Sequence, residues 1–146
     1  MKIFTTGGCG FIGSNFIIEQ INKNNKILNF DKLTYAANQE NLSDIDTNPN
    51  YIFVNGDIKN SEKVSSSINE FNPNIIINFA AESHVDRSID GPKEFIKTNI
   101  MGTYELLQSS LSYFNNLSDD DKSQFKFIHV STDEVYGSLG YEGRFK

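Results

Sequence analysis

Directly after Met1 the chain reads Lys2-Ile3-Phe4-Thr5-Thr6-Gly7-Gly8-Cys9-Gly10-Phe11-Ile12-Gly13, and this stretch decides the class of fold. It starts with a short run of residues that favour β-strands, and glycines follow at once. From Phe11 to Asn22 the apolar residues then stand at helical spacing. The pattern predicts a strand, a tight turn and a helix, in that order.

The glycines Gly7, Gly10 and Gly13 have the spacing GxxGxxG, which suits a turn that binds a dinucleotide. The first would turn the chain, the second would let the backbone approach a pyrophosphate, and the third would let the helix pack against the strand. The helix N-terminus would then face the anion. Glycines that only form a turn are the alternative interpretation.

An acidic residue stands at the end of the next expected strand, where it would lie beside this glycine turn. Asp31 stands eighteen positions after Gly13, where a carboxylate can hold both ribose hydroxyls and so favours NAD over NADP. Lys32 beside it favours the opposite preference, because a cation could bind the 2′-phosphate of NADP. We therefore predict an NAD site at these two strand ends. Because of Lys32, binding of NADP stays the alternative.

The rest of the chain alternates strands with helices, which predicts an α/β fold, a Rossmann-type doubly wound parallel sheet with right-handed crossovers. The glycine turn after the first strand favours the strand order 3-2-1-4-5. The unalternating apolar run at 75–79 indicates a strand buried on both faces, and the polar stretch 115–124 is expected to be a loop. Ser61 is expected to cap one helix and Pro73 to follow it. Strands are expected at 26–30, 51–54, 75–79 and 125–130, and helices at 61–71 and from Pro92 through Ile96, Ile100, Tyr104, Leu107, Leu111 and Phe114.

Composition narrows the classes of function. The 146 residues fit one domain, and a net charge of −6 argues against binding nucleic acid through its phosphates. Cys9 is the only cysteine, so an internal disulfide and a CxxC metal site are excluded. No apolar run reaches the length of a membrane span, and no signal peptide is evident. We expect a soluble cytoplasmic protein that binds neither nucleic acid nor membrane.

Two further strand ends carry candidate cofactor contacts. Asp57 could accept a hydrogen bond from an adenine amino group while Ile58 packs on the ring, although a plain turn aspartate is nearly as good an interpretation. Phe79, Ala80 and Ala81 follow the central apolar strand, and small residues there would let a dinucleotide cross closely. Packing within the sheet is the alternative reason for those small side chains.

Several reactive residue types are expected to have no catalytic role. His84 and His129 have no second ligand at helical or strand spacing, so neither predicts a metal site. His129 is expected to pack in its strand, whereas His84 lies on the cofactor side. Arg87 could face a substrate phosphate or pair with Asp86 or Asp90. Cys9 is interpreted as a small spacer inside the glycine turn, and Met101 and the tyrosines of the long helix as core.

The strongest candidate for chemistry is the run Ser131-Thr132-Asp133-Glu134-Val135-Tyr136-Gly137, directly after the last expected strand. Parallel α/β folds keep their chemistry at the carboxyl ends of strands. A hydroxyl and two carboxylates there offer a hydrogen-bond donor, a proton donor and a proton acceptor if their surroundings separate the two pKa values. A solvated turn with a capping acid is the alternative.

Together these motifs resemble the dTDP-glucose 4,6-dehydratases, a group of extended short-chain dehydrogenases/reductases. The resemblance runs through the whole chain, and the Asp-Glu pair separates it from the related sugar-nucleotide epimerases. It is carried by residues 7–13, Asp31-Lys32-Leu33-Thr34-Tyr35-Ala36, Ala80-Ala81-Glu82-Ser83-His84-Val85-Asp86-Arg87-Ser88, Thr98-Asn99 and residues 131–137.

The resemblance implies that NAD oxidises C4 of a glucosyl group and later returns hydride to C6, with loss of water, to give a 4-keto-6-deoxy sugar nucleotide. Glu134 would take the C5 proton, Asp133 would protonate the departing C6 hydroxyl, and Thr132 would form a hydrogen bond with the C4 oxygen. Ser83 matches a substrate contact. The residues that match the family's NAD contacts are Phe11, Ile12, Asp31, Lys32, Leu33, Thr34, Asp57, Ile58, Phe79, Ala80, Ala81 and Thr98.

Two departures from the family pattern limit what the chain is expected to do. Ala37 stands where the family usually has glycine, and no tyrosine here has a lysine four residues later, so the family's Tyr-x-x-x-Lys pair is absent. The C-terminal substrate domain and one of two helices of the family's homodimer interface are absent as well. We therefore expect an N-terminal NAD-binding portion with little turnover alone, marginal stability or self-association. A non-catalytic NAD-binding module and another NDP-sugar dehydratase or epimerase are the alternatives.

Overall fold

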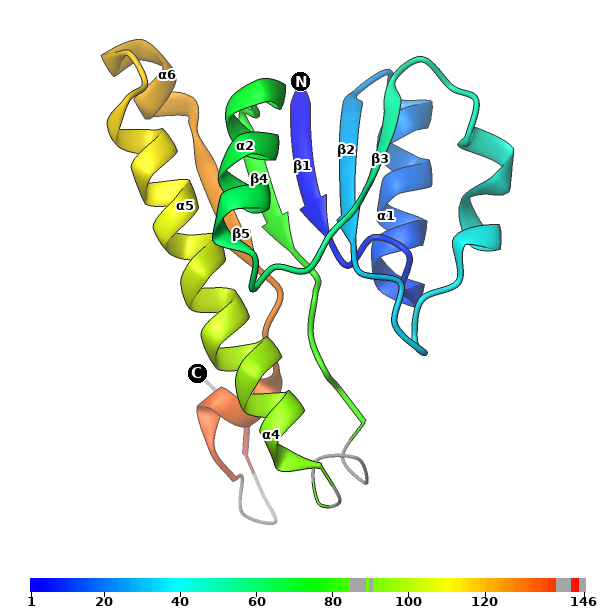
Figure 1. Cartoon of the computed structure of the whole chain (residues 1–146), viewed down its shortest axis with the longest axis vertical. Coiled ribbons are helices and arrows are strands. Elements are labelled where there is room, and N and C mark those ends of the chain that lie inside the picture. Colours follow the sequence, from blue (N-terminus) through cyan, green and yellow to red (C-terminus); the bar gives the residue numbers. More distant parts are fainter. Residues whose placement is uncertain (85–88, 90, 139–142, 145–146) are drawn as a thin grey trace.

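The computed structural model describes residues 1–84, 89, 91–138 and 143–144. Five parallel strands form one sheet in the order β3-β2-β1-β4-β5, which confirms the expected order (Figure 1). All five run the same way, so their carboxyl ends share one edge of the sheet. The strands are β1 Lys2–Thr6, β2 Lys26–Asp31, β3 Tyr51–Asn55, β4 Ile75–Asn78 and β5 Lys126–His129.

Both faces of the sheet are covered, because successive strand residues point to opposite sides. One core lies between the sheet and the helices α1 (Phe11–Asn22) and η1 (Gln39–Ile45), and it contains the strand residues Ile3, Ile27 and Ile77. Phe4 and Ile76 face the other core, beneath α2 (Ser61–Phe71) and α5 (Thr103–Asn115). This two-sided burial explains why 75–77 is apolar without alternation.

The helix that begins at Pro92 is long but not uniform. It runs through α4 (Pro92–Phe95), a π-helical segment η2 (Ile96–Gly102) and α5. Its buried face carries Gly102, Leu106, Ser109, Ser110 and Tyr113, not the repeat of large apolar residues. Ser109 Oγ accepts a hydrogen bond from Ser65 Oγ of α2 at 2.9 Å. Small residues on this face let the two helices approach closely.

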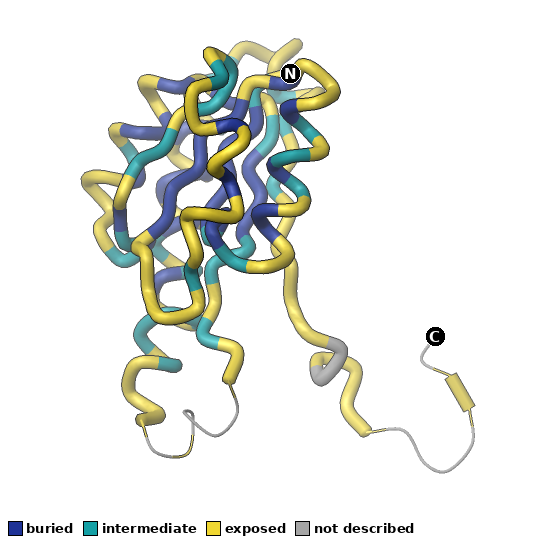
Figure 2. The backbone as a smooth tube through the Cα atoms, turned by 90° about the vertical axis from the view of Figure 1, so that its right-hand side faces the viewer, coloured by how far each residue is buried: buried dark blue, intermediate teal, exposed yellow. Residues whose placement is uncertain are grey.

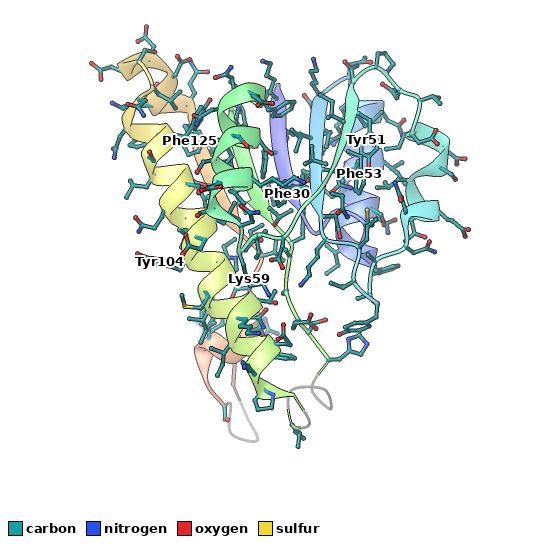
Figure 3. The ribbon with its side chains drawn as sticks, in the orientation of Figure 1. Phe30, Tyr51, Phe53, Lys59, Tyr104 and Phe125 are labelled. Atoms are coloured by element: carbon teal, nitrogen blue, oxygen red, sulfur yellow. The ribbon has the colours of Figure 1, made fainter. Side chains whose placement is uncertain are left out.

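The large apolar repeat of this helix therefore lies on the outside, which corrects the core assignment of Met101 and Tyr104. Ile100 is 60% exposed and Tyr104 52% exposed, and Tyr104 points away from the sheet in Figure 3. Tyr113 is buried, as expected of the helix's tyrosines, and its hydroxyl donates to the carbonyl oxygen of Pro73 at 3.1 Å. We call the exposed residues Ile96, Ile100, Met101, Tyr104, Leu107 and Leu111 the outer stripe.

Three local expectations are wrong. Asn60, not Ser61, caps α2, since its side chain accepts from the N–H of Lys63. The stretch expected to be a loop contains helix α6 (Asp119–Gln124), because Ser118 caps it and three aspartates occupy its first turn. His129 is exposed on the edge strand β5, where its ring meets the amide of Asn78 at 3.0 Å.

The chain after β5 leaves the body of the domain. Figure 2 shows it running away from the sheet, with exposed residues along its described part. It includes the short helical turn η3 (Asp133–Tyr136). Within the described part of the chain, no helix has both the length and the apolar character to cross a membrane.

Candidate cofactor-binding site

A cleft of about 500 Å³ lies across the carboxyl ends of the strands. The glycine turn after β1 forms one part of its wall, the segments after β2, β3, β4 and β5 form most of the rest, and Thr98 of η2 completes it. Its described lining residues are Gly7, Gly10, Phe11, Ile12, Gly13, Phe30, Asp31, Lys32, Thr34, Ala36, Ala37, Gly56, Asp57, Ile58, Phe79, Ala80, Ala81, Glu82, Ser83, His84, Thr98, Val130 and Ser131.

The glycine turn is packed so tightly that side chains would not fit. Gly7 has a φ of +66°, and a Cβ there would lie 2.6 Å from the backbone nitrogen of Ala80. A Cβ on Gly13 would lie 2.6 Å from the carbonyl oxygen of Gly7. Helix α1 starts at this turn with Gly10 as its N-cap, so no side chain covers the helix N-terminus. Phe11, which lines the cleft there, is 82% exposed.

The carboxylate of Asp31 ties the end of β2 to the glycine turn. Its Oδ2 accepts from the N–H of Cys9 at 2.9 Å, and its Oδ1 accepts from the N–H of Leu33 at 2.8 Å. Leu33 has a φ of 58°, a left-handed conformation that strains a residue with a Cβ. Asp31 is only 6% exposed. The acid expected to bind ribose therefore also holds the turn together.

Two lysines converge on Asp57 at the end of β3. Lys32 Nζ lies 2.8 Å and Lys59 Nζ 3.4 Å from Asp57 Oδ2. Burial would raise the pKa of Asp57, but the hydrogen bond from Lys32, that from the Lys59 N–H and the two positive charges hold this pKa below its usual value. The hydrogen bond to Asp57 raises the pKa of Lys32 despite the opposing effect of burial. The pair is ionised across the neutral range.

The loop after β4 is fixed from two sides. Asn99, in the π-helical segment, accepts from the N–H of Glu82 and donates to its carbonyl oxygen, both at 2.8 Å. From the β2 loop, the Tyr35 hydroxyl donates to Glu82 Oε2 at 3.1 Å, and the Tyr35 ring meets the His84 ring edge-on with centroids 5.3 Å apart. These contacts join the loops after β2 and β4 at the cleft.

A polar cluster supports the glycine turn from below. Asn29 Nδ2 donates to Cys9 Sγ at 3.4 Å and to the Tyr51 hydroxyl at 3.0 Å. Burial, with the nearby charge of Asp31, raises the pKa of the Cys9 thiol to about 11. Burial likewise raises the pKa of Tyr51 to about 12. Cys9 is thus a neutral buried thiol, which agrees with its interpretation as a spacer.

The candidate catalytic run starts at the edge of the cleft. Ser131 lines it, whereas Thr132 is exposed and absent from the described lining. Asp133 and Glu134 begin the η3 turn, and their side chains lie outside the described part of the structure. Arg87, with Asp86 and Asp90, also lies outside the described residues. The catalytic roles stay predictions.

The cleft gathers nearly all of the residues predicted to contact a cofactor, and also Ser83, predicted to contact the substrate. Leu33 is the predicted cofactor contact that does not line the cleft in the described part of the structure. Its N–H donates to Asp31. Phe30, Glu82 and Val130 also line the cleft and were not predicted as site residues. Phe30 and Val130 stand near the ends of β2 and β5, and Glu82 belongs to the motif at 80–88; these are the sequence signals that could have indicated them.

Comparison with known proteins assigns the family. The family model described as GDP-mannose 4,6 dehydratase matches residues 4–145. The chain belongs to this family. Within the family it is 49% identical over 140 residues to the dTDP-glucose 4,6-dehydratase of Xanthomonas campestris pv. campestris, and 50% identical over 141 residues to that of Salmonella typhimurium. The matches cover 96% and 95% of this chain but only 40% and 39% of those enzymes.

Solved structures of the family share the fold. A crystal structure of dTDP-glucose 4,6-dehydratase from Bacillus anthracis in complex with NAD superposes with a TM-score of 0.82 at 44% identity, covering 100% of this chain and 42% of that one. The dTDP-glucose 4,6-dehydratase of Streptomyces venezuelae, also with NAD bound, gives 0.85 at 37% identity, covering 99% and 43%. This chain is homologous to the N-terminal part of these dehydratases.

Proposed function

We propose that these 146 residues form the NAD-binding part of a dTDP-glucose 4,6-dehydratase, a lyase that converts dTDP-glucose to dTDP-4-keto-6-deoxyglucose with loss of water. The observation that carries the proposal is the cleft, with the glycine turn, Asp31 and Asp57 along its walls. Two family structures with similar folds hold NAD.

The residues present suit a dinucleotide. The N-terminus of α1 is uncovered, and Gly10 at its N-cap has no side chain to separate the backbone from a pyrophosphate. Gly7 and Gly13 let the turn pack closely on the surrounding backbone, where a Cβ would not fit. Phe11 and Ile12 stay largely exposed there, although both are apolar, and a bound nucleotide would cover them. Asp31 would accept from the ribose, Asp57 from the adenine amino group, and Thr98 and the alanines after β4 would line the nicotinamide half.

NAD supplies hydride acceptance and return when it is bound. Two of the chain's own residues would move protons: Glu134 would remove the C5 proton and Asp133 would protonate the leaving C6 hydroxyl. Thr132 would form a hydrogen bond with the C4 oxygen. Ser83 would contact the substrate. We propose that the segment alone binds NAD without turnover, since these residues hold no Tyr-x-x-x-Lys pair. We also propose that the protein acts in the reducing cytoplasm. For the full-length enzymes of the family we propose a homodimer.

Titration of the 146-residue chain with NADH, followed by nucleotide fluorescence, tests the cofactor site. We expect saturable binding, and loss of it in Gly13→Ala, whose new Cβ would meet the Gly7 carbonyl oxygen. Ala37→Gly is a matched control at the same cleft, and we expect it to keep binding. Failure of the parent chain to bind NADH would refute the proposed site.

A chimaera tests the chemistry. Residues 1–146 would replace the matching part of the Salmonella typhimurium enzyme, to which they are 50% identical. We expect the chimaera to consume dTDP-glucose and release a 4-keto-6-deoxy product, and Glu134→Gln to abolish exchange of the C5 proton. Because the family model is described for GDP-mannose, GDP-mannose is offered in parallel. Turnover of GDP-mannose in place of dTDP-glucose would reverse our choice of substrate.

A further inference from the structure

The lysines that the structure describes at the adenosine end of the cleft are paired with carboxylates. Among the described lining residues, Lys32 is the only lysine or arginine, and its Nζ lies 2.8 Å from Asp57 Oδ2. Lys59, which Figure 3 labels near the long helix, shares the same oxygen and reaches Glu94 Oε2 at 3.7 Å. Glu94 in turn pairs with Lys97 at 2.8 Å. Positive and negative charges thus alternate from Lys32 to Lys97.

This arrangement bears on which dinucleotide the cleft accepts. NADP differs from NAD by a phosphate on the adenosine 2′ oxygen, and binding of that dianion requires a nearby cation. Lys32 directly follows Asp31, the residue proposed to meet the ribose, so it is the natural partner for a 2′-phosphate. In the structure its ammonium group is directed to Asp57 instead, and Asp31 keeps a negative charge beside the ribose position.

We propose that Asp57 determines the preference for NAD over NADP, because it holds Lys32 in an ion pair and so withholds the cation that a 2′-phosphate needs. The inference rests on the proposed cofactor site. It assigns Asp57 an electrostatic role in addition to its proposed contact with adenine. Without Asp57, Lys32 would be free to bind the 2′-phosphate and so to offset the repulsion between that phosphate and the Asp31 carboxylate.

Asp57→Asn is the sharpest test. The amide oxygen can still accept from the Lys59 N–H, as Asp57 Oδ1 does at 3.0 Å, so the turn is retained while the charge that holds Lys32 is removed. Dissociation constants for NADH and NADPH are measured by nucleotide fluorescence on the 146-residue chain. Because both nucleotides carry the same adenine, any lost contact to adenine cancels in the ratio of the two constants.

We expect Asp57→Asn to shift the ratio about tenfold toward NADPH, which corresponds to about 1.4 kcal/mol. Lys32→Gln in the same chain should remove most of this gain, since the released lysine causes it. Raising the salt concentration should reduce the gain, because Lys32 is half exposed. Asp120→Asn makes the same change of charge on α6, near the opposite end of the sheet, and should leave the ratio unchanged.

The outcomes separate the two proposals. If the parent chain binds NADH and Asp57→Asn leaves the ratio unchanged, the inference is wrong and the cofactor site stands. If the parent chain binds neither nucleotide, the proposed site is refuted and the inference with it. A thermal melt checks that the variant is folded. Should it unfold, Asp57→Ser, which also offers an acceptor for the Lys59 N–H, undergoes the same comparison.

Discussion

Asp31→Ala should destabilise the folded chain even without any nucleotide. The carboxylate accepts from two backbone N–H groups, that of Cys9 at 2.9 Å and that of Leu33 at 2.8 Å. It thereby joins the glycine turn to the end of β2 and holds Leu33 in its left-handed conformation. An acid that only bound ribose would leave the stability of the free protein unchanged when replaced.

The expected magnitude follows from the two hydrogen bonds. A bond from a backbone N–H to a charged group contributes about 1.5–3 kcal/mol. The Cys9 N–H is buried and would lose its partner outright, whereas the Leu33 N–H is only partly buried and can turn to water. We expect Asp31→Ala to lower the free energy of unfolding by about 3 kcal/mol. For a chain of this length that lowers the melting temperature by about 10 °C.

Thermal and urea unfolding of the nucleotide-free protein measure this effect. Asp31→Asn retains one acceptor oxygen and should lose about half as much stability, roughly 1.5 kcal/mol. Asp44→Ala, at an exposed aspartate of η1, is the control and should unfold as the parent does. If Asp31→Ala melts within about 2 °C of the parent, the carboxylate does not support the turn and the argument from its two hydrogen bonds is refuted.

Four further predictions concern other parts of the chain. Tyr35→Phe removes the 3.1 Å hydrogen bond to Glu82 across the cleft but keeps the ring, so bound NADH should leave several-fold faster in stopped-flow displacement; an unchanged rate contradicts this. Cys9 has a pKa raised from 9.0 to about 11, so its thiolate fraction at pH 8 is about a hundredfold lower than in the unfolded chain, and a thiol reagent should react much faster in urea. Since the unfolded thiol ionises first, the free energy of unfolding should fall between pH 9 and 11, and Cys9→Ser should flatten that fall; equal slopes would refute the assignment. Leu107→Lys with Leu111→Lys should reduce self-association in sedimentation experiments without lowering the melting temperature, because both side chains are exposed in the outer stripe; a large loss of stability would show that the stripe is core.

Patterns within short segments predicted most of the architecture. The strand, glycine turn and helix at 2–22 were predicted from residue type and spacing, as was the apolar run that becomes β4. The strand order was predicted from the glycine turn after the first strand, and the structure confirms it. Nearly all predicted cofactor contacts line one cleft, because parallel strands bring their carboxyl ends to a single edge. Whether they bind NAD stays a prediction.

Patterns failed where the partner of a residue lay in another element. The long helix shows its strongest apolar repeat in the outer stripe, whereas Ser109 contacts Ser65 of α2 and Gly102 packs on Ile58, because close packing on that face requires small residues. Helix α6 was missed because its helical content comes from the Ser118 cap and its acidic first turn, not from an apolar face. His129 was expected to pack in its strand, but its side chain is exposed and its ring meets the amide of Asn78 on β4.

The sequence by itself determined the class of fold, the glycine turn and the acid at the end of β2, because each depends on residues close together in the chain. Only the tertiary structure decided what those charges do. Lys32 could meet a phosphate as far as its neighbours in sequence are concerned, yet folding brings Asp57 to 2.8 Å from it. An ion pair between two strand ends depends on a distance in space, and no spacing along the chain encodes that distance.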